Sequence, residues 1–278
     1  MQTFRDRTAV ITGAASGIGL ELARRAAAEG MNLFLADIEG DKLAAAAAGL
    51  GVPEGRVATQ RVDVSQEQEI QALADAAFAR FGGVHLLCNN AGIGMNRVTW
   101  EHTTADWEWV LGVNLMSVVF GIRHFLPRML EQAEGGHVVN TASVAGLLST
   151  PGMAAYNVSK HGVVTLSETL YTELKDLQAR VGVSLLCPAW VPTGIHQSDR
   201  NRQARFGPKM AATGISARYE ERMAKAIHSG RLTAADMAGA VFDAVAADRF
   251  YVIPHRKINH AIQLRMEDIL NLRNPTPL

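Results

Sequence analysis

Short apolar runs alternate along the chain with longer stretches of helical periodicity. Continuous apolar runs of about four to eight residues are typical of strands buried on both faces, and apolar residues spaced three and four apart are typical of helices. The sequence therefore predicts strands at 8–12, 32–36, 56–62, 84–89, 137–141, 183–187 and 250–253. It predicts helices near 17–29, 40–49, 66–81, 104–131, 155–179 and 233–247.

This alternation predicts an α/β fold. Apolar strands separated by helices favour a parallel sheet covered on both faces, so we expect residues 1–278 to form a single-domain, doubly wound sheet of the Rossmann type. Such sheets bind ligands at the carboxyl ends of their strands. Two of the helix starts carry possible capping boxes, Ser65 with Gln68 and Thr233 with Asp236.

Two stretches interrupt the alternation. Residues 194–232 are polar, lack apolar periodicity and hold eight Lys/Arg against three Asp/Glu, which predicts a mobile, solvated flap that covers a substrate. Attraction of an anionic substrate by that charge is the alternative. The tail at about 255–278 predicts an amphipathic helix docked on another surface. Its apolar residues at helical spacing are Ile258, Ile262, Met266 and Ile269.

Composition narrows the possible partners and location. Lys plus Arg and Asp plus Glu number 27 each, so no excess charge attracts nucleic acid or an anionic membrane surface. The first residues lack the apolar region of a signal peptide, and no run is expected to approach the length of a membrane span, so we expect a cytoplasmic protein. Cys88 and Cys187 lie in apolar runs and are expected to be buried thiols. The nine histidines form no spaced ligand set, so no metal is expected.

A glycine-rich turn joins the first predicted strand to the first predicted helix. Residues 12–19 read Thr-Gly-Ala-Ala-Ser-Gly-Ile-Gly. Glycines let the backbone turn tightly and approach a pyrophosphate, while the helix N-terminus offers free N–H groups and the positive end of its dipole. Three glycines alone are a weak signal, but their place between strand and helix favours a dinucleotide site. The expected contacts are Gly13, Ser16, Gly17, Ile18 and Gly19.

Asp37 stands at the end of the second predicted strand, eighteen residues after Gly19. A carboxylate there would accept hydrogen bonds from the adenosine ribose hydroxyls and repel a 2′-phosphate. Its neighbours Ile38 and Glu39 are not basic, so NAD is expected in preference to NADP. The alternative interpretation is that Asp37 only caps a helix or closes a turn.

Tyr156 and Lys160 lie four residues apart at the start of a predicted helix, which places phenol and ammonium on one face. Such a pair is weak evidence when isolated. Together with the glycine-rich turn it resembles the short-chain dehydrogenase/reductase family, over roughly residues 5–193. The other motifs that carry the resemblance are Asn89-Asn90-Ala91-Gly92 after the fourth strand, Asn114 in the following helix and Ser143 after the fifth strand.

The resemblance implies a role for each catalytic position. Tyr156 would be the general acid and base, and Lys160 would hold the nicotinamide ribose and lower the pKa of the phenol. Ser143 would orient the carbonyl oxygen, and Asn114 would keep a water in a proton relay. An unperturbed phenol has a pKa of about 10, so nearby positive charge is needed to favour the phenolate.

The resemblance also implies further cofactor contacts. Asp63 and Val64 would lie at the adenine, and Asn90, Ala91 and Gly92 along the adenosine. Val191 and Thr193 would lie near the nicotinamide amide. One departure is visible, because Ala189 stands where the family usually has glycine, which puts the geometry of that loop in doubt.

These features predict an NAD-dependent oxidoreductase that interconverts a hydrophobic secondary alcohol, alicyclic, steroid-like or aryl, and its ketone. The apolar substrate pocket would include Met95, Leu147, Met153 and Trp190. The family resemblance implies a homo-oligomer, a tetramer or dimer. One alternative is an NADPH-dependent biosynthetic reductase of ketones or 3-oxoacyl thioesters. Another is a non-catalytic dinucleotide sensor or scaffold, which need not keep Asn114, Ser143, Tyr156 and Lys160 together.

Overall fold

A parallel sheet forms the centre of the computed structural model, which describes residues 1 and 3–277. Its strands lie in the order β3-β2-β1-β4-β5-β6-β7, and each neighbouring pair is parallel. Every residue of β1, β4 and β5 is buried, as expected for strands with helices on both faces. The strands are β1 (Thr8–Thr12), β2 (Asn32–Asp37), β3 (Val57–Arg61), β4 (Leu86–Asn89), β5 (Gly136–Thr141), β6 (Val181–Leu186) and β7 (Tyr251–Val252).

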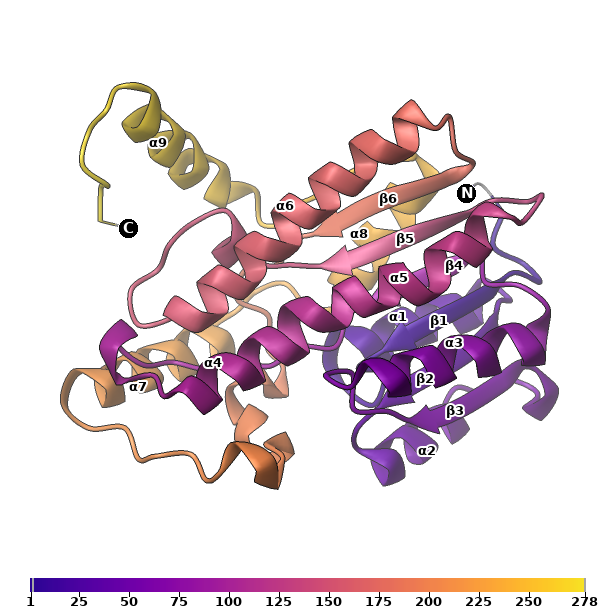
Figure 1. Ribbon diagram of the computed structural model, residues 1–278, viewed down its shortest axis with the longest axis horizontal. Coiled ribbons are helices and arrows are strands. Elements are labelled where there is room, and N and C mark those ends of the chain that lie inside the picture. The colour runs from indigo at the N-terminus through magenta and orange to yellow at the C-terminus, as the bar shows by residue number, and fades with distance from the viewer. Residues whose placement is uncertain (2, 278) are drawn as a thin grey trace.

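Helices cover both faces of the sheet (Figure 1). One layer consists of α1 (Gly17–Ala28), α2 (Gly40–Ala48) and α8 (Ala234–Ala246). The other consists of α3 (Glu67–Phe81), α4 (Thr104–Leu111), α5 (Ser117–Leu130) and α6 (Ala154–Asp176). Leu22 and Phe242 pack on the first face, and Trp109 and Phe125 on the second. This arrangement confirms the predicted doubly wound α/β fold.

The strand order places a binding crevice between β1 and β4. From β1 the chain winds outward through β2 and β3, then returns to β4 on the other side of β1. The connections leaving β1 and β4 therefore run in opposite directions, and a crevice opens at the carboxyl ends of these two strands. The glycine-rich turn and the Asn90 segment meet there.

The stretch at 194–232 contains helical elements that the sequence did not predict. It contains 3₁₀ turns at Gly194–Asn201 and Ala204–Phe206, followed by α7 (Gly214–His228). The expectation that it lacks apolar periodicity is wrong, because Met223 and Ile227 lie four residues apart on α7 and are buried against Tyr156. Two residues make too narrow an apolar stripe to stand out in a polar sequence.

The long helix predicted at 104–131 is divided. A π-helical turn at Gly112–Met116 separates α4 from α5. The whole 27-residue stretch Thr104–Leu130 is long and apolar enough to cross a membrane by length and composition, so the expectation that no run reaches that length is wrong. Half of the most apolar part of this stretch is buried inside the molecule, where α5 packs on α3 and α4 packs on α6. Buried core helices of soluble proteins can be equally long and apolar.

The predicted tail helix is present but does not dock on this chain. It forms α9 (Asn259–Leu270), which projects from the body of the molecule (Figure 1). Met266 and Ile269 are 44% and 52% exposed. Its main neighbour in the described chain is the 3₁₀ turn at Arg256–Ile258, so the docking of its apolar face on another surface stays a prediction.

One of the two predicted capping boxes is confirmed. At the start of α8, Thr233 and Asp236 bond reciprocally to each other's backbone N–H groups. The box predicted at Ser65 is wrong, since α3 begins at Glu67 and the Ser65 hydroxyl instead donates to Asp63 Oδ1 over 2.6 Å. A nearby carboxylate thus competes successfully for the hydroxyl.

Candidate active site

The β1–α1 turn lies directly against the segment that follows β4. Gly13 has a φ of +69°, and a Cβ added there would lie 2.9 Å from Ala91 Cα. A Cβ added at Gly19 would lie 2.0 Å from the Gly13 carbonyl oxygen. Asn90 Nδ2 donates to the Thr12 carbonyl oxygen over 3.0 Å, which joins the two segments. Only glycine fits this cradle, as the binding of a pyrophosphate at a helix N-terminus requires.

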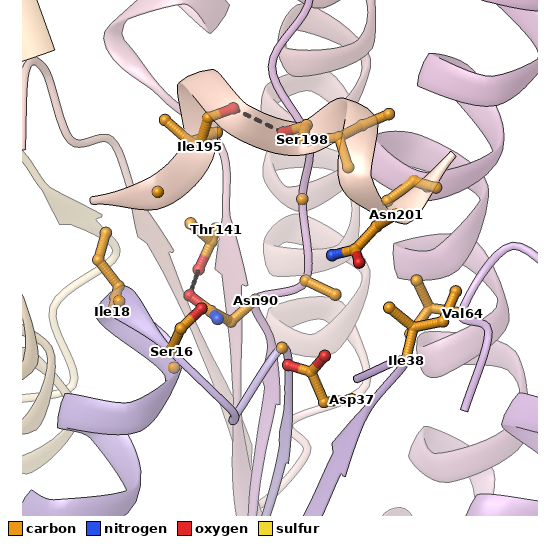
Figure 2. A pocket seen from close by; sticks show the side chains of 18 of the residues that line it. Ser16, Ile18, Asp37, Ile38, Val64, Asn90, Thr141, Ile195, Ser198 and Asn201 are labelled. Carbon is orange, nitrogen blue, oxygen red and sulfur yellow. Dashed lines mark hydrogen bonds between the residues drawn. The ribbon is translucent and has the colours of Figure 1, made fainter. Parts of the chain in front are cut away.

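Asp37 at the end of β2 holds the same turn. Its Oδ2 accepts a hydrogen bond from Ala15 N over 2.9 Å, and its Oδ1 accepts one from Glu39 N over 3.0 Å. The side chain faces the cavity beside Ser16 (Figure 2). Asp37 is therefore part of a structured turn, as the alternative interpretation had it, and also lines the cavity where a ribose is expected.

The cavity follows the carboxyl ends of the strands from Asp37 to Lys160. Nearly all the residues predicted to contact the cofactor line it. They are Gly13, Ser16, Gly17, Ile18, Gly19, Asp37, Asp63, Val64, Asn90, Ala91, Gly92, Tyr156, Lys160 and Thr193. Val191 is the exception, since it packs in the α1–α8 layer and lines a neighbouring cavity.

The segment 194–206 lies across this cavity. Figure 2 shows its first 3₁₀ turn, with Ile195, Ser198 and Asn201, opposite Ser16 and Asp37. The sequence prediction placed this segment over the substrate and missed its contribution to the dinucleotide cavity. The available signal in the sequence was the excess of Lys and Arg over Asp and Glu in residues 194–232. The lining residues it contributes are Gly194, Ile195, Ser198, Arg200, Asn201 and Gln203.

Three arginines attach this segment to carboxylates around the cavity. Arg200 Nη2 lies 3.1 Å from Glu39 Oε2, and Arg205 Nη2 lies 3.0 Å from Asp63 Oδ2. The third pair, Arg202 with Asp106, has both side chains 5% exposed and a separation of 2.9 Å. These three cations of the flap are thus paired with the protein's own carboxylates and are not free to attract an anionic substrate.

Glu39 is the most strongly perturbed of these carboxylates. Burial alone would raise its pKa, but hydrogen bonds from Lys42, Arg200 and Asn201 outweigh that effect and lower the pKa to about 2. The carboxylate is therefore ionised and already neutralised by its partners at physiological pH.

The predicted catalytic side chains converge where α6 begins. Lys160 is 3% exposed and its Nζ donates to the Thr141 carbonyl oxygen over 2.9 Å, so that it faces the dinucleotide cavity. Burial lowers the pKa of Lys160 to about 8. Ser143 follows β5, where its hydroxyl accepts from Ala145 N and donates to the Pro188 carbonyl oxygen.

The phenol of Tyr156 does not have the lowered pKa that the resemblance implied. Burial raises its pKa, and the neighbouring Ser143 hydroxyl opposes this only in part. Lys160 Nζ is 5.8 Å from the centre of the Tyr156 ring and bonds to a backbone carbonyl instead of the phenol. In the protein alone, Tyr156 is therefore a protonated phenol at neutral pH.

Asn114 lies in the π-helical turn between α4 and α5 and is fully buried. Its Oδ1 accepts from Ile93 N over 2.8 Å, while Nδ2 donates to the Ile93 carbonyl oxygen and to Ser159 Oγ. The side chain thus fixes the segment that follows Gly92 beside α6. Its expected part in holding a water stays a prediction.

A second cavity, of about 380 Å³, adjoins the first. Tyr156 lines both, and Ser143 lines the second, together with Met95, Met153 and Trp190 as predicted. Leu147, also predicted there, instead packs against the cluster of Val163 and Cys187, so that assignment is wrong. Sequence reasoning missed the wall that α7 supplies through Met223, Ala224 and Ile227.

The loop after β6 tolerates the unusual alanine. Ala189 does not have a positive φ, so a Cβ there introduces no backbone strain. Its backbone N–H donates to His255 Nδ1 over 3.2 Å. The backbone of this loop therefore does not require glycine at position 189.

Comparisons with known proteins agree with this geometry. Residues 7–204 match the family model described as short chain dehydrogenase. A crystal structure of a short-chain dehydrogenase/reductase from Burkholderia phymatum in complex with NAD has a TM-score of 0.97 and 48% identity, covering 100% of this chain and 99% of that chain. The chain is 32% identical to a CLA biosynthesis dehydrogenase/reductase of Lactiplantibacillus plantarum, over 97% of this chain and 95% of the relative. It is also 32% identical to a 1-deoxy-11-beta-hydroxypentalenate dehydrogenase of Streptomyces exfoliatus, over 99% and 93%.

Proposed function

The chain belongs to the short-chain dehydrogenase/reductase family of oxidoreductases, and from that premise we propose that it transfers a hydride between NAD and a hydrophobic secondary alcohol or its ketone. The observation that carries this proposal is the position of Tyr156, whose side chain lines both the dinucleotide cavity and the adjoining apolar cavity. A proton donor at that junction can reach an oxygen in the second cavity while the reacting carbon faces the first.

The preference for NAD is supported by the charges at the end of β2. Asp37 and Glu39 both line the cavity, and Arg200, a cation that lines it beside them, is paired with Glu39. A 2′-phosphate would meet carboxylates there, whereas ribose hydroxyls would find acceptors. The relative from Burkholderia phymatum, which is similar over the full length, was crystallised in complex with NAD. When bound, the nicotinamide would accept or supply the hydride.

The chain's own residues would position the substrate and move its proton. The Ser143 hydroxyl would hydrogen-bond the substrate oxygen, and the Tyr156 phenol would give it a proton during ketone reduction or remove one during alcohol oxidation. Because burial raises the pKa of Tyr156, the protein is already in the proton-donating state. Oxidation needs the phenolate, which is favoured by the positive charge of Lys160 and by alkaline pH.

Replacement of Tyr156 by phenylalanine tests the mechanism. The change removes one hydroxyl from a buried ring, so we expect turnover to fall at least about a thousandfold while NADH binding changes less than about threefold. Turnover is followed by NADH absorbance over a panel of cyclic and aryl alcohols, and binding by NADH fluorescence. Retained activity would refute the mechanism. Nucleotide binding with no turnover of any alcohol by the unaltered protein would favour a sensor or scaffold.

A further inference from the structure

A cluster of three charged side chains forms part of the wall of the second cavity. Lys209 Nζ donates to Asp199 Oδ2 over 2.8 Å and lies 2.9 Å from Glu220 Oε1. Burial would lower the pKa of Lys209, but its two carboxylate partners outweigh burial and raise it. The ammonium therefore stays charged, and the three groups together carry a net charge of −1. One of the three N–H donors of Lys209 remains for a ligand.

The helix α7 connects this cluster to the apolar part of the cavity. Glu220, Met223, Ala224 and Ile227 recur at helical spacing and all line the cavity. Met223 and Ile227 pack with Tyr156, while Glu220 lies about 10 Å from Ile227 along the helix axis. A ligand lying along this face of α7 would therefore have an apolar body and meet charged groups near Glu220.

Hydrogen-bond acceptors exceed donors in this part of the wall. Lys209 meets one oxygen of each carboxylate, Asp199 Oδ2 and Glu220 Oε1. The second oxygens, Asp199 Oδ1 and Glu220 Oε2, remain as acceptors, and the two side chains are 37% and 31% exposed. Two carboxylates around one ammonium therefore favour a ligand group that donates a hydrogen bond.

We propose that Glu220, Lys209 and Asp199 form a hydroxyl-binding subsite, so that the substrate is a neutral molecule with an apolar body, a reacting secondary alcohol or ketone, and a second hydroxyl. A hydroxyl can donate to Glu220 or Asp199 and accept the remaining N–H of Lys209. A carboxylate can only accept, and it meets a net negative cluster. The inference rests on the proposed function, because it assigns the second cavity to the substrate.

Three matched bicyclic probes test the subsite: decalin-2-ol, decalin-2,6-diol and 6-hydroxydecalin-2-carboxylate. Their dissociation constants are measured by calorimetric titration of the protein without nucleotide, so that the result does not depend on turnover. We expect the diol to bind about tenfold more tightly than decalin-2-ol, and the carboxylate at least about tenfold more weakly than decalin-2-ol. Equal binding of diol and carboxylate, or no binding of any probe, would overturn the subsite.

Two variants identify the residue responsible. Glu220→Gln brings the cluster to zero net charge and is expected to improve carboxylate binding relative to the diol about tenfold. Glu221→Gln is the matched control, because Glu221 also lines the cavity but is exposed and paired with Lys225. Equal effects of the two substitutions would contradict the assignment to Glu220. The probe comparison on the unaltered protein stands even if Glu220→Gln does not fold.

Turnover of the same probes separates this inference from the proposed function. The expected binding order without oxidation of any probe by NAD or NADP would refute the proposed activity and leave the subsite standing. Oxidation of all three probes with equal efficiency would support the activity and refute the subsite.

Discussion

Replacement of Asp37 by asparagine should change the choice between NAD and NADP. The substitution keeps the size of the side chain and removes its charge at the end of β2. Both carboxylate oxygens of Asp37 accept backbone hydrogen bonds, from Ala15 and Glu39, and asparagine has one acceptor oxygen, so one of these bonds is lost at a cost of about 1 kcal/mol. That loss affects both nucleotides equally. The two nucleotides are affected differently only by the loss of the Asp37 negative charge, which would repel the 2′-phosphate of NADP.

The size of the effect follows from the position of Asp37. The side chain is 7% exposed and lines the dinucleotide cavity, where an added 2′-phosphate would lie beside it. Two unit charges about 4 Å apart repel each other by about 4 kcal/mol at an effective dielectric constant of about 20, and by about 1 kcal/mol in bulk water. For this partly shielded site we take the repulsion between Asp37 and the 2′-phosphate as about 2 to 4 kcal/mol. Removing it corresponds to a change of roughly 30- to 1,000-fold in the preference for NAD over NADP.

The assay compares kcat/KM for NAD and NADP with one alcohol. In Asp37→Asn the ratio of kcat/KM for NADP to kcat/KM for NAD should rise by roughly 30- to 1,000-fold. Asp41→Asn is the matched control, because Asp41 lies in the first turn of α2 and is exposed, so removing its charge should change the ratio less than about threefold. A change below about threefold in Asp37→Asn, or an equal change in both variants, would refute the reasoning. A strong preference of the unaltered protein for NADPH would favour the biosynthetic reductase.

Two further predictions concern stability. Arg202→Met leaves the buried Asp106 carboxylate without its ion-pair partner, so the free energy of unfolding in urea should fall by about 3 kcal/mol and recover in part when Asp106→Asn is added; a loss below about 1 kcal/mol would contradict this. Burial lowers the pKa of His137 from 6.5 to about 3, so the folded protein keeps this ring neutral while the unfolded chain protonates it. Stability due to His137 is therefore complete above pH 6.5 and falls by about 1.4 kcal/mol per pH unit as the pH drops toward 3. His137→Gln should weaken this pH dependence between pH 7 and 5, and an unchanged slope would show that other groups cause it.

Much of the dinucleotide cavity could be predicted from the sequence because its parts are local. The turn at Gly13 to Gly19 forms where a strand meets a helix, and Tyr156 and Lys160 share a helix face by spacing alone. Asp37 stands at a strand end, and all carboxyl ends of a parallel sheet meet at one edge. Once the alternation of strands and helices predicts such a sheet, these residues are brought together by its topology.

The wall of the second cavity depends on packing between segments distant in sequence. Leu147 and Met153 both follow β5 as apolar residues, yet only Met153 faces the cavity, and no periodicity distinguishes them. Met223 and Ile227 of α7 form part of this wall because they pack against Tyr156, about 70 residues earlier in the chain.

The sequence by itself determined the α/β fold, the glycine-rich cradle and the Tyr156–Lys160 pair, because spacing along a strand or helix decides which side chains share a face. Only the tertiary structure decided where the flap lies and what its charges do. Its composition shows an excess of cations, but the partners of Arg200 and Arg205 are carboxylates 161 and 142 residues away in the chain. Electrostatic pairing depends on distance in space, which composition does not contain. The flap is therefore attached across the dinucleotide cavity by its arginines and presents the apolar face of α7, with Glu220 at one end, to the second cavity.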